Sequence, residues 1–230
     1  MHVPYPEHPH RPPSGFRIRD AELSDVESIV SIWYASFNAS NKFFDYVTPN
    51  DTATRKWLQD LFTMGIMAGP GTIRTFVVED LSRENKLVAF SRWIVPQADG
   101  NQDIPMPPVP PQWDPEITDV LWGGMARSRA RVMGQNPHWM AEFIAIENAY
   151  HHVGLAFALF DWGIHQAEVS GLEIYGDATV RGLPVWKRYG AEERGLVIRI
   201  PARPGYFDKY EVVPMVLTPK TKATRDRAKL

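Results

Sequence analysis

Two acidic residues lie in apolar segments of the sequence, where a carboxylate is unexpected unless it has a structural or functional role. Glu142 interrupts the apolar stretch 139–146, and Asp177 lies near the end of a second stretch, 172–179. Burying a carboxylate is costly unless it faces a cleft or a charged partner, and an ionisable group in a cleft is a candidate for proton transfer. For Glu142 the alternative is an ion pair with an arginine across a sheet. For Asp177 it is a cap on the helix that follows.

A candidate anion-binding site follows the first of these stretches. Residues 154–169 have the apolar spacing of a helix, and Gly154 stands at its entry after a turn over residues 147–152. The first N–H groups of a helix are unpaired and lie at the positive end of its dipole, so they bind anions such as phosphate. The alternative is an ordinary glycine at a strand-to-helix turn, with no ligand.

Metal and thiol chemistry are not indicated. His151 and His152 lie close to Glu147, but adjacent side chains splay apart in extended or turn backbone, and no His-x-x-x-His spacing exists. The chain has no cysteine, which excludes disulfides, thiolate metal sites and a cysteine nucleophile.

Length and composition limit the class of protein. The 230 residues, 44% of them hydrophobic, fit one large domain with a real core and exclude intrinsic disorder as the main state. The net charge of -2 provides no positive field for nucleic acid. No apolar run approaches the length of a membrane span, and no secretory signal opens the chain. We therefore expect a soluble intracellular protein without nucleic-acid or membrane partners.

Proline divides the chain. Many of its 20 prolines fall in two clusters, which predict a flexible arm at 1–15 and a long loop insertion at 96–115. Residues 218–230 form a basic tail, so the folded domain is expected over 16–217. The loop lies just before the helix that leads into stretch 139–146, where it could border a site entrance.

The order of elements predicts the fold class. Strand–helix–strand units indicate a partly parallel sheet covered by helices, an α/β (α+β) protein. Ser24 to Glu27 has the pattern of a capping box, and the run Arg127, Arg129, Arg131 is expected on a solvated helix face. We expect strands at 16–19, 75–79, 86–90, 139–146, 172–179, 195–200 and 210–217, and helices at 24–37, from 52 to the region 65–71, and at 116–133, 154–169 and 183–189.

Two segments resemble the GNAT superfamily of N-acetyltransferases. Residues 138–156 (HWMAEFIAIENAYHHVGLA) are similar to the strand, turn and helix with which that family binds acyl-coenzyme A, and their His-Trp opening resembles fungal members. Residues 182–191 (GLPVWKRYGA) are similar to the family's Gly-x-x-Leu-Tyr-x-x-x-Gly-Phe segment. The resemblance covers 16–217 apart from the proline loop. It implies a mixed, mostly antiparallel central sheet flanked by helices, with a central strand–turn–helix coenzyme A site.

The resemblance also implies roles in binding acetyl-CoA as cosubstrate. Backbone groups of the 144–146 segment would pair with the pantetheine arm as an added strand, and N–H groups from 152 to 156 would hold the pyrophosphate. His151 and Val153 depart from the basic or amide residues usual at their positions, so side chains contribute less charge here. The coenzyme-binding residues implied are Ile144, Ala145, Ile146, His151, His152, Val153, Gly154, Leu155, Ala156 and Trp186.

For catalysis, the resemblance implies that the protein has candidates for a general base but lacks the tyrosine that acts as general acid in the family. Trp186 stands where the family often carries the tyrosine that protonates the leaving thiolate, and an indole cannot act as an acid near neutral pH. The thiolate can take its proton from water. The amine must lose a proton before it attacks. Glu142 is the first candidate for the base that accepts it, and Asp177 is the second. In the family, the turn after the first helix borders the acceptor pocket, and it is aromatic here: Trp33, Tyr34, Phe37, Phe43, Phe44 and Tyr46.

The resemblance therefore predicts an N-acetyltransferase. It would move an acetyl group from acetyl-CoA to an amine of a small molecule by direct attack in a ternary complex, without a metal, as a monomer or homodimer. The alternative is a catalytically weak or inactive acyl-CoA-binding protein. The ending Ala228-Lys229-Leu230 is similar to the peroxisomal Ser-Lys-Leu signal, so the expected location is peroxisomal or cytoplasmic.

Overall fold

A computed structural model describes residues 12–39, 41–101, 104 and 106–219. Most of the predicted arm, part of the proline loop and the ending Ala228-Lys229-Leu230 lie outside the described residues. None of the described helices combines the length and the apolar character needed to cross a membrane.

A sheet of eight strands organises the described part of the chain, in the order β1-β2-β3-β4-β5-β8-β6, with β7 also paired to β8. Neighbours β4 and β5 run parallel and the other described pairs antiparallel, which confirms the predicted mixed, mostly antiparallel sheet. The strands are β1 (Phe16–Asp20), β2 (Ile73–Asp80), β3 (Lys86–Ile94), β4 (Trp139–Ile146), β5 (Ile174–Thr179), β6 (Glu192–Glu193), β7 (Ile198–Ile200) and β8 (Tyr210–Leu217).

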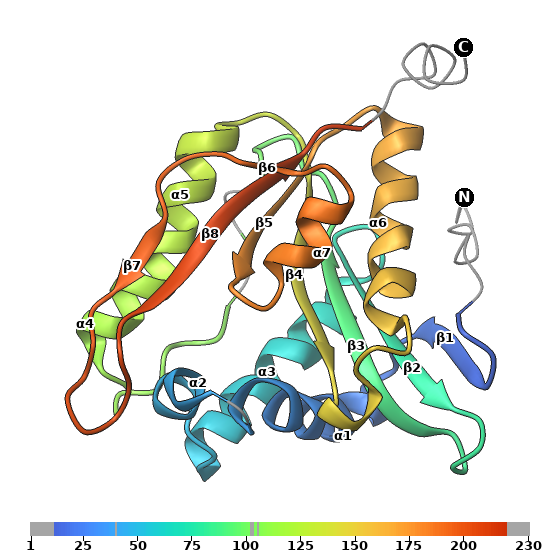
Figure 1. Ribbon diagram of the computed structural model, residues 1–230, viewed down its shortest axis with the longest axis horizontal. Coiled ribbons are helices and arrows are strands. Elements are labelled where there is room, and N and C mark those ends of the chain that lie inside the picture. The colour runs from blue at the N-terminus through green and yellow to red at the C-terminus, as the bar shows by residue number, and fades with distance from the viewer. Residues whose placement is uncertain (1–11, 40, 102–103, 105, 220–230) are drawn as a thin grey trace.

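Helices cover both faces of the sheet (Figure 1). One face packs against α6 and α7, and the other against α1, α2, α3 and α5, so the core lies in two layers on either side of the strands. The α-helices are α1 (Val26–Trp33), α2 (Lys42–Val47), α3 (Thr52–Ala68), α4 (Pro115–Thr118), α5 (Gly124–Met133), α6 (Leu155–Ser170) and α7 (Leu183–Arg188). Shorter 3₁₀ or π turns are η1 (Leu23–Asp25), η2 (Tyr34–Asn38), η3 (Asp119–Gly123) and η4 (Asn148–Tyr150).

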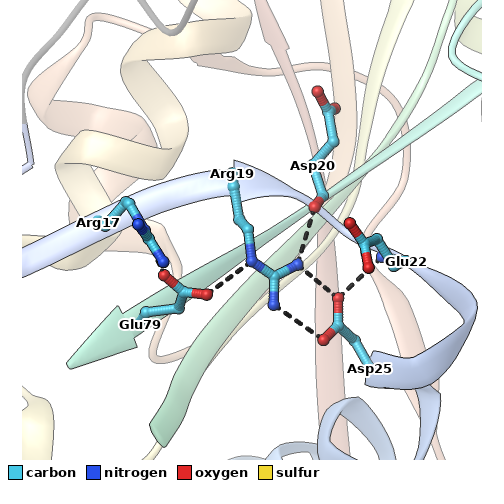
Figure 2. Close-up of polar contacts among 6 residues, drawn as sticks. All are labelled: Arg17, Arg19, Asp20, Glu22, Asp25 and Glu79. Atoms are coloured by element: carbon cyan, nitrogen blue, oxygen red, sulfur yellow. Dashed lines mark hydrogen bonds and ion pairs between the residues drawn. The ribbon is translucent and has the colours of Figure 1, made fainter. Parts of the chain in front are cut away.

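Charged side chains fix the edge strand β1 to its neighbours. Glu79 of β2 is buried and accepts hydrogen bonds from Arg17 and Arg19, the second at 2.6 Å. Arg19 also donates to Asp25 (Figure 2). Asp25 in turn accepts from the backbone N–H of Glu22, so the capping box lies two residues earlier than the predicted Ser24–Glu27 pattern. This network ties β1 to the start of α1.

The proline loop packs on α3. Trp113 is buried, and its Nε1 donates to Thr54 Oγ1 at 3.0 Å. Trp57 Nε1 donates in the opposite direction, to the carbonyl oxygen of Pro107 at 3.2 Å. The loop's described residues are absent from the cleft lining given below, and the role of the loop at a site entrance stays a prediction.

Strands β4 and β5 separate soon after they begin. They pair only at Trp139 with Ile174 and at Met140 with Tyr175, and Figure 1 shows them diverging toward their C-terminal ends. Two parallel strands that part in this way leave backbone groups of both strands without a ladder partner. The gap between them is where the candidate site lies.

Candidate functional site

A cleft of about 640 Å³ opens where β4 and β5 part. Its walls come from both sides of the sheet, so it passes between the two strands. One end is lined by the turn before α6, the first turn of α6 and α7, and the other by α1, η2, α2, η3, the start of α5 and the start of β8. Of the predicted site residues it brings together Glu142, Ile144, Ile146, His151, His152, Gly154, Leu155, Ala156, Asp177 and Trp186.

The first turn of α6 presents free N–H groups to the cleft. Gly154 has φ of +92°, a left-handed conformation that favours glycine, and the preceding His152 has φ of +65°. The first hydrogen bond of the helix runs from the N–H of Ala158 to the carbonyl of Gly154. The N–H groups of Leu155, Ala156 and Phe157 therefore precede the helical ladder. This arrangement has the geometry that binds an anion.

The backbone of β4 alternates between its neighbour and the cleft. The N–H of Glu147 donates to the carbonyl of Val88 on the β3 side, so the alternation of an antiparallel pair turns Ile144 and Ile146 away from β3. The N–H of Ile146 donates to Ser36 Oγ at 3.2 Å, and the ring Nε2 of His151 lies 3.2 Å from its carbonyl oxygen. The backbone N–H and carbonyl of Ile146 on the cleft side of β4 are thus bound by side chains that can rotate away. Ser36 was not identified as a site residue from the sequence.

Two predicted coenzyme residues are not in the lining. Ala145 packs its side chain into the core beneath α1 and α3, and its neighbours in β4 show that its backbone faces β3. Val153 has 43% of its surface exposed and is not among the lining residues. The residues on either side of these two line the cleft instead: Ile144 and Ile146 beside Ala145, and His152 and Gly154 beside Val153.

Trp186 lies deep in the gap between the strands. It is 6% exposed, and its ring contacts Phe160 edge-on at 4.8 Å between centroids. Gly176 of β5 makes room for it, because a Cβ there would lie 2.4 Å from the indole and 2.9 Å from the carbonyl oxygen of Ala141. Tyr189, one turn away, donates to Asp161 on α6 instead of facing the cleft. The indole is thus the α7 side chain that reaches the strand gap.

Glu142 occupies a β-bulge. Arg92 of β3 lies opposite Phe143, but the next residue, Trp93, lies opposite Ala141, so Glu142 is the extra residue on β4. A bulge re-aims a side chain, and here Oε2 of Glu142 lies 2.6 Å from Nη1 of the fully buried Arg92. Glu142 therefore makes the cross-sheet ion pair and also lines the cleft.

The arginine has space because α3 carries a glycine above it. A Cβ on Gly65 would lie 3.0 Å from Nε of Arg92. This close approach explains why a glycine stands inside α3, although glycine is about 1 kcal/mol less favourable than alanine within a helix. Burial raises the pKa of Glu142, while the positive charges of Arg92 and Arg129 oppose that rise. Because arginine keeps its proton, the carboxylate is held beside a permanent cation.

Asp177 is the carboxylate best suited to take up a proton. Burial raises its pKa from 3.8 to about 7, against opposing effects of a hydrogen bond from Tyr175 and the charge of Arg129. Tyr175 Oη donates to Oδ1 at 2.8 Å, and the second oxygen, Oδ2, is buried without a hydrogen-bond partner. The N-cap of α7 is Gly182, so Asp177 does not serve as the helix cap that was the alternative reading.

Arg129 is a site residue that the sequence reading misplaced. It is 6% exposed, and Nη1 lies 3.3 Å from the sulfur of Met140, so the expected solvated face is wrong at this position. Arg127 does pair at the surface, with Asp119 at 2.9 Å. The signal available in the sequence was helical spacing, because Arg129 stands four residues after one methionine of α5 and four before another.

Aromatic side chains form the far end of the cleft. The rings of Trp33 and Phe37 lie 4.7 Å apart, and those of Phe37 and Phe44 lie 5.0 Å apart, measured between centroids. Tyr210 of β8 contacts Phe44 at 5.7 Å. Around these rings the lining includes Trp33, Phe37, Asn41, Phe44, Leu121, Trp122, Met125, Tyr210 and Val212.

Within the described residues, no group of three or more histidines, cysteines or carboxylates is placed to hold a metal ion. His151 and His152 have their ring centroids 6.2 Å apart, at right angles to each other.

Several solved structures are similar to this chain over most of its length. The C-terminal condensation domain of Ebony, in complex with beta-alanyl-dopamine, aligns with a TM-score of 0.67 at 10% identity, over 88% of this chain and 98% of that one. A mosquito arylalkylamine N-acetyltransferase (like 5b) gives 0.56 at 14%, over 88% and 99%. A GNAT-family protein from Desulfovibrio desulfuricans gives 0.50 at 10%, over 88% and 98%. No family model matches the sequence, and no curated protein matches it. The described chain therefore has the fold of the GNAT acetyltransferases.

Proposed function

We propose that this protein transfers an acetyl group from acetyl-CoA to an amine of a small molecule, by direct attack in a ternary complex. The observation that carries the proposal is the position of Asp177. Its carboxylate, with a pKa of about 7, lines a cleft that joins the N-terminus of α6 to an aromatic chamber through the gap between β4 and β5. A base, an anion site and an acceptor chamber thus share one cavity.

The residues at the coenzyme end fit acetyl-CoA. The N–H groups at 155–157 would hold the pyrophosphate at the positive end of the α6 dipole. The backbone of Ile144 and Ile146 would pair with the pantetheine arm, and Ser36 and His151 would then release the groups of Ile146 that they now hold. When bound, the coenzyme supplies an activated acetyl thioester.

Asp177 is the base in this proposal and Glu142 is not. Glu142 is bound to Arg92 at 2.6 Å, and taking up a proton would break a buried ion pair. Asp177 has a buried oxygen without a partner and a pKa near the working pH of most enzymes. As the amine nitrogen bonds to the thioester carbonyl carbon, Asp177 takes the proton that the nitrogen loses.

The departing sulfur would receive its proton from water. Breaking of the C–S bond leaves a thiolate, and Trp186 at the strand gap can donate a hydrogen bond but not a proton at neutral pH. The neighbours described above support acyl transfer to amines: one is named an arylalkylamine N-acetyltransferase, and another binds beta-alanyl-dopamine.

A second candidate function is coenzyme binding without transfer. It is favoured by the same Trp186, which replaces a proton donor, and by His151 and Val153, which leave the pyrophosphate to backbone groups. The two candidates share the coenzyme site and differ at the acceptor.

Two measurements on the full chain test the proposal. Acetyl-CoA should raise the unfolding temperature, because a ligand that binds the folded state stabilises it. Free thiol should then be released from acetyl-CoA when a panel of primary amines is added, and Asp177→Asn should reduce that release at least 100-fold, a typical loss for a general base. Binding with no thiol release from any amine would leave only the coenzyme-binding function. Absence of any acetyl-CoA stabilisation would overturn both.

A further inference from the structure

We propose that the acceptor is an arylalkyl monoamine: a primary amine with one positive charge, joined by a short alkyl chain to an aromatic ring. The inference rests on the acetyl transfer proposed above and names the substrate class of that same site. It comes from the walls of the far end of the cleft and from the charges that remain available there.

The chamber wall is aromatic and rigid. Trp33 is 1% exposed and its ring is fixed by Phe143 at 5.1 Å between centroids, while Phe44 is held by Phe43 at 5.2 Å. Because these rings are locked in the core clusters beneath the sheet, they present a preformed apolar surface. Such a surface binds a flat apolar group with little loss of conformational entropy.

The wall also includes apolar side chains from three further elements. These come from η3, from the start of α5 and from β8: Leu121, Trp122, Met125 and Val212. An aromatic ring that enters this chamber would therefore meet mostly apolar side chains. A hydrophilic alkyl polyamine would lose its hydration against these apolar walls.

The charges at the strand gap allow one ammonium group. Within the described lining, Glu142 and Asp177 are the acidic side chains, and Arg92 already neutralises Glu142 at 2.6 Å. That leaves Asp177 to face a cation.

The hydroxyl groups at the chamber complete the description of the acceptor. Tyr210 shares side-chain hydrogen bonds with Asn41 and Thr179, and all three line the cleft. A polar substituent on the far side of the ring would have partners there. Tyramine-like amines are thus within the proposed class, whereas spermidine-like amines are outside it.

The test compares amine acceptors that carry one positive charge with an acceptor that carries several. Ethylamine, phenethylamine, tyramine and spermidine are supplied with acetyl-CoA, and kcat/KM is measured from thiol release. We expect kcat/KM for phenethylamine to exceed that for ethylamine about 30-fold, which corresponds to ~2 kcal/mol for burying one phenyl ring. We expect kcat/KM for spermidine to be lower than that for phenethylamine.

A charge variant supplies an independent check. Met125→Glu places a carboxylate in the chamber wall, and we expect it to raise the ratio of spermidine to phenethylamine turnover at least 10-fold. Met67→Glu adds the same charge on exposed α3 surface, outside the described lining, and should leave that ratio unchanged. A shift at 67 as large as at 125 would overturn the proposal.

The outcomes separate the substrate class from the function. Equal or greater turnover of spermidine or ethylamine by the unmodified protein would overturn the arylalkyl class while leaving acetyl transfer intact. No thiol release from any amine, despite acetyl-CoA binding, would overturn the function on which the class rests. If Met125→Glu does not fold, as judged by thermal unfolding, the acceptor series on the unmodified protein decides alone.

Discussion

Replacing Asp177 with asparagine should stabilise the protein at alkaline pH while removing its activity. The carboxylate is forced to ionise in a buried site, where its Oδ2 has no hydrogen-bond partner. Asparagine is nearly the same size and keeps an oxygen for the hydrogen bond from Tyr175. The substitution therefore removes the buried charge and little else. An active-site group that costs stability is a common compromise in enzymes.

The magnitude follows from the pKa of the carboxyl group. Folding raises it from 3.8 to about 7, so between these values the folded state binds more protons than the unfolded state, and stability falls as the pH rises. Each pH unit in that window costs about 1.4 kcal/mol. The full loss above pH 7 is at most about 4 kcal/mol, and the part that falls between pH 5 and pH 8.5 is about 3 kcal/mol.

The assay is urea unfolding at pH 5 and pH 8.5 of the unmodified protein and of Asp177→Asn. We expect the variant to gain about 3 kcal/mol relative to the unmodified protein on going from pH 5 to 8.5, with an unchanged dependence on urea. Asp208→Asn removes an exposed carboxylate on the β7–β8 turn and controls for net charge. If the two variants show the same pH dependence, Asp177 is not the buried base inferred here.

Three further changes probe the surroundings of this group. Arg129→Met should move the pH midpoint of acetyl transfer above 7, because the arginine charge lowers the pKa of Asp177; an unmoved midpoint would remove Arg129 from the site. Arg92→Leu should cost about 3–5 kcal/mol in urea unfolding by leaving Glu142 buried without its partner, and Arg92→Leu with Glu142→Leu should cost less; equal losses would show that packing and not charge is at stake. Gly163→Ala places a methyl carbon 2.1 Å from a buried tryptophan ring of β3 and should lower the free energy of unfolding by about 1–3 kcal/mol, a loss that an unchanged urea midpoint would disprove.

Periodicity predicted the elements that are apolar along their length. Strand 139–146 and strand 210–217 were expected at the bounds that the structure shows, because both are buried almost continuously. Helix α2 was missed. It has six residues, too few for a helical repeat to appear, and its stability comes from packing on β7 and β8.

The sequence identified individual residues of the candidate site but not which of them pair with one another. Glu142 was flagged by its burial cost, and the sequence allowed either a base or an ion pair. The choice depends on the bulge in β4 and on Gly65, which let a guanidinium lie under α3. A bulge is set by the register between two strands, and no local pattern in either strand records it.

In the proposed reaction, the charges at the strand gap favour attack by the neutral form of the amine. Arg92 pairs with Glu142, which leaves Asp177 as the carboxylate that an entering ammonium meets, and the charge of Arg129 partly offsets it. Burial and nearby cations both lower the pKa of an amine, and the same Arg129 keeps that of Asp177 from rising further. The two pKa values are thereby brought toward each other, which is the condition for proton transfer between them near neutral pH. A second ammonium on the acceptor would add a further unbalanced charge, so the arrangement that helps the proton leave is also the one that selects a monoamine.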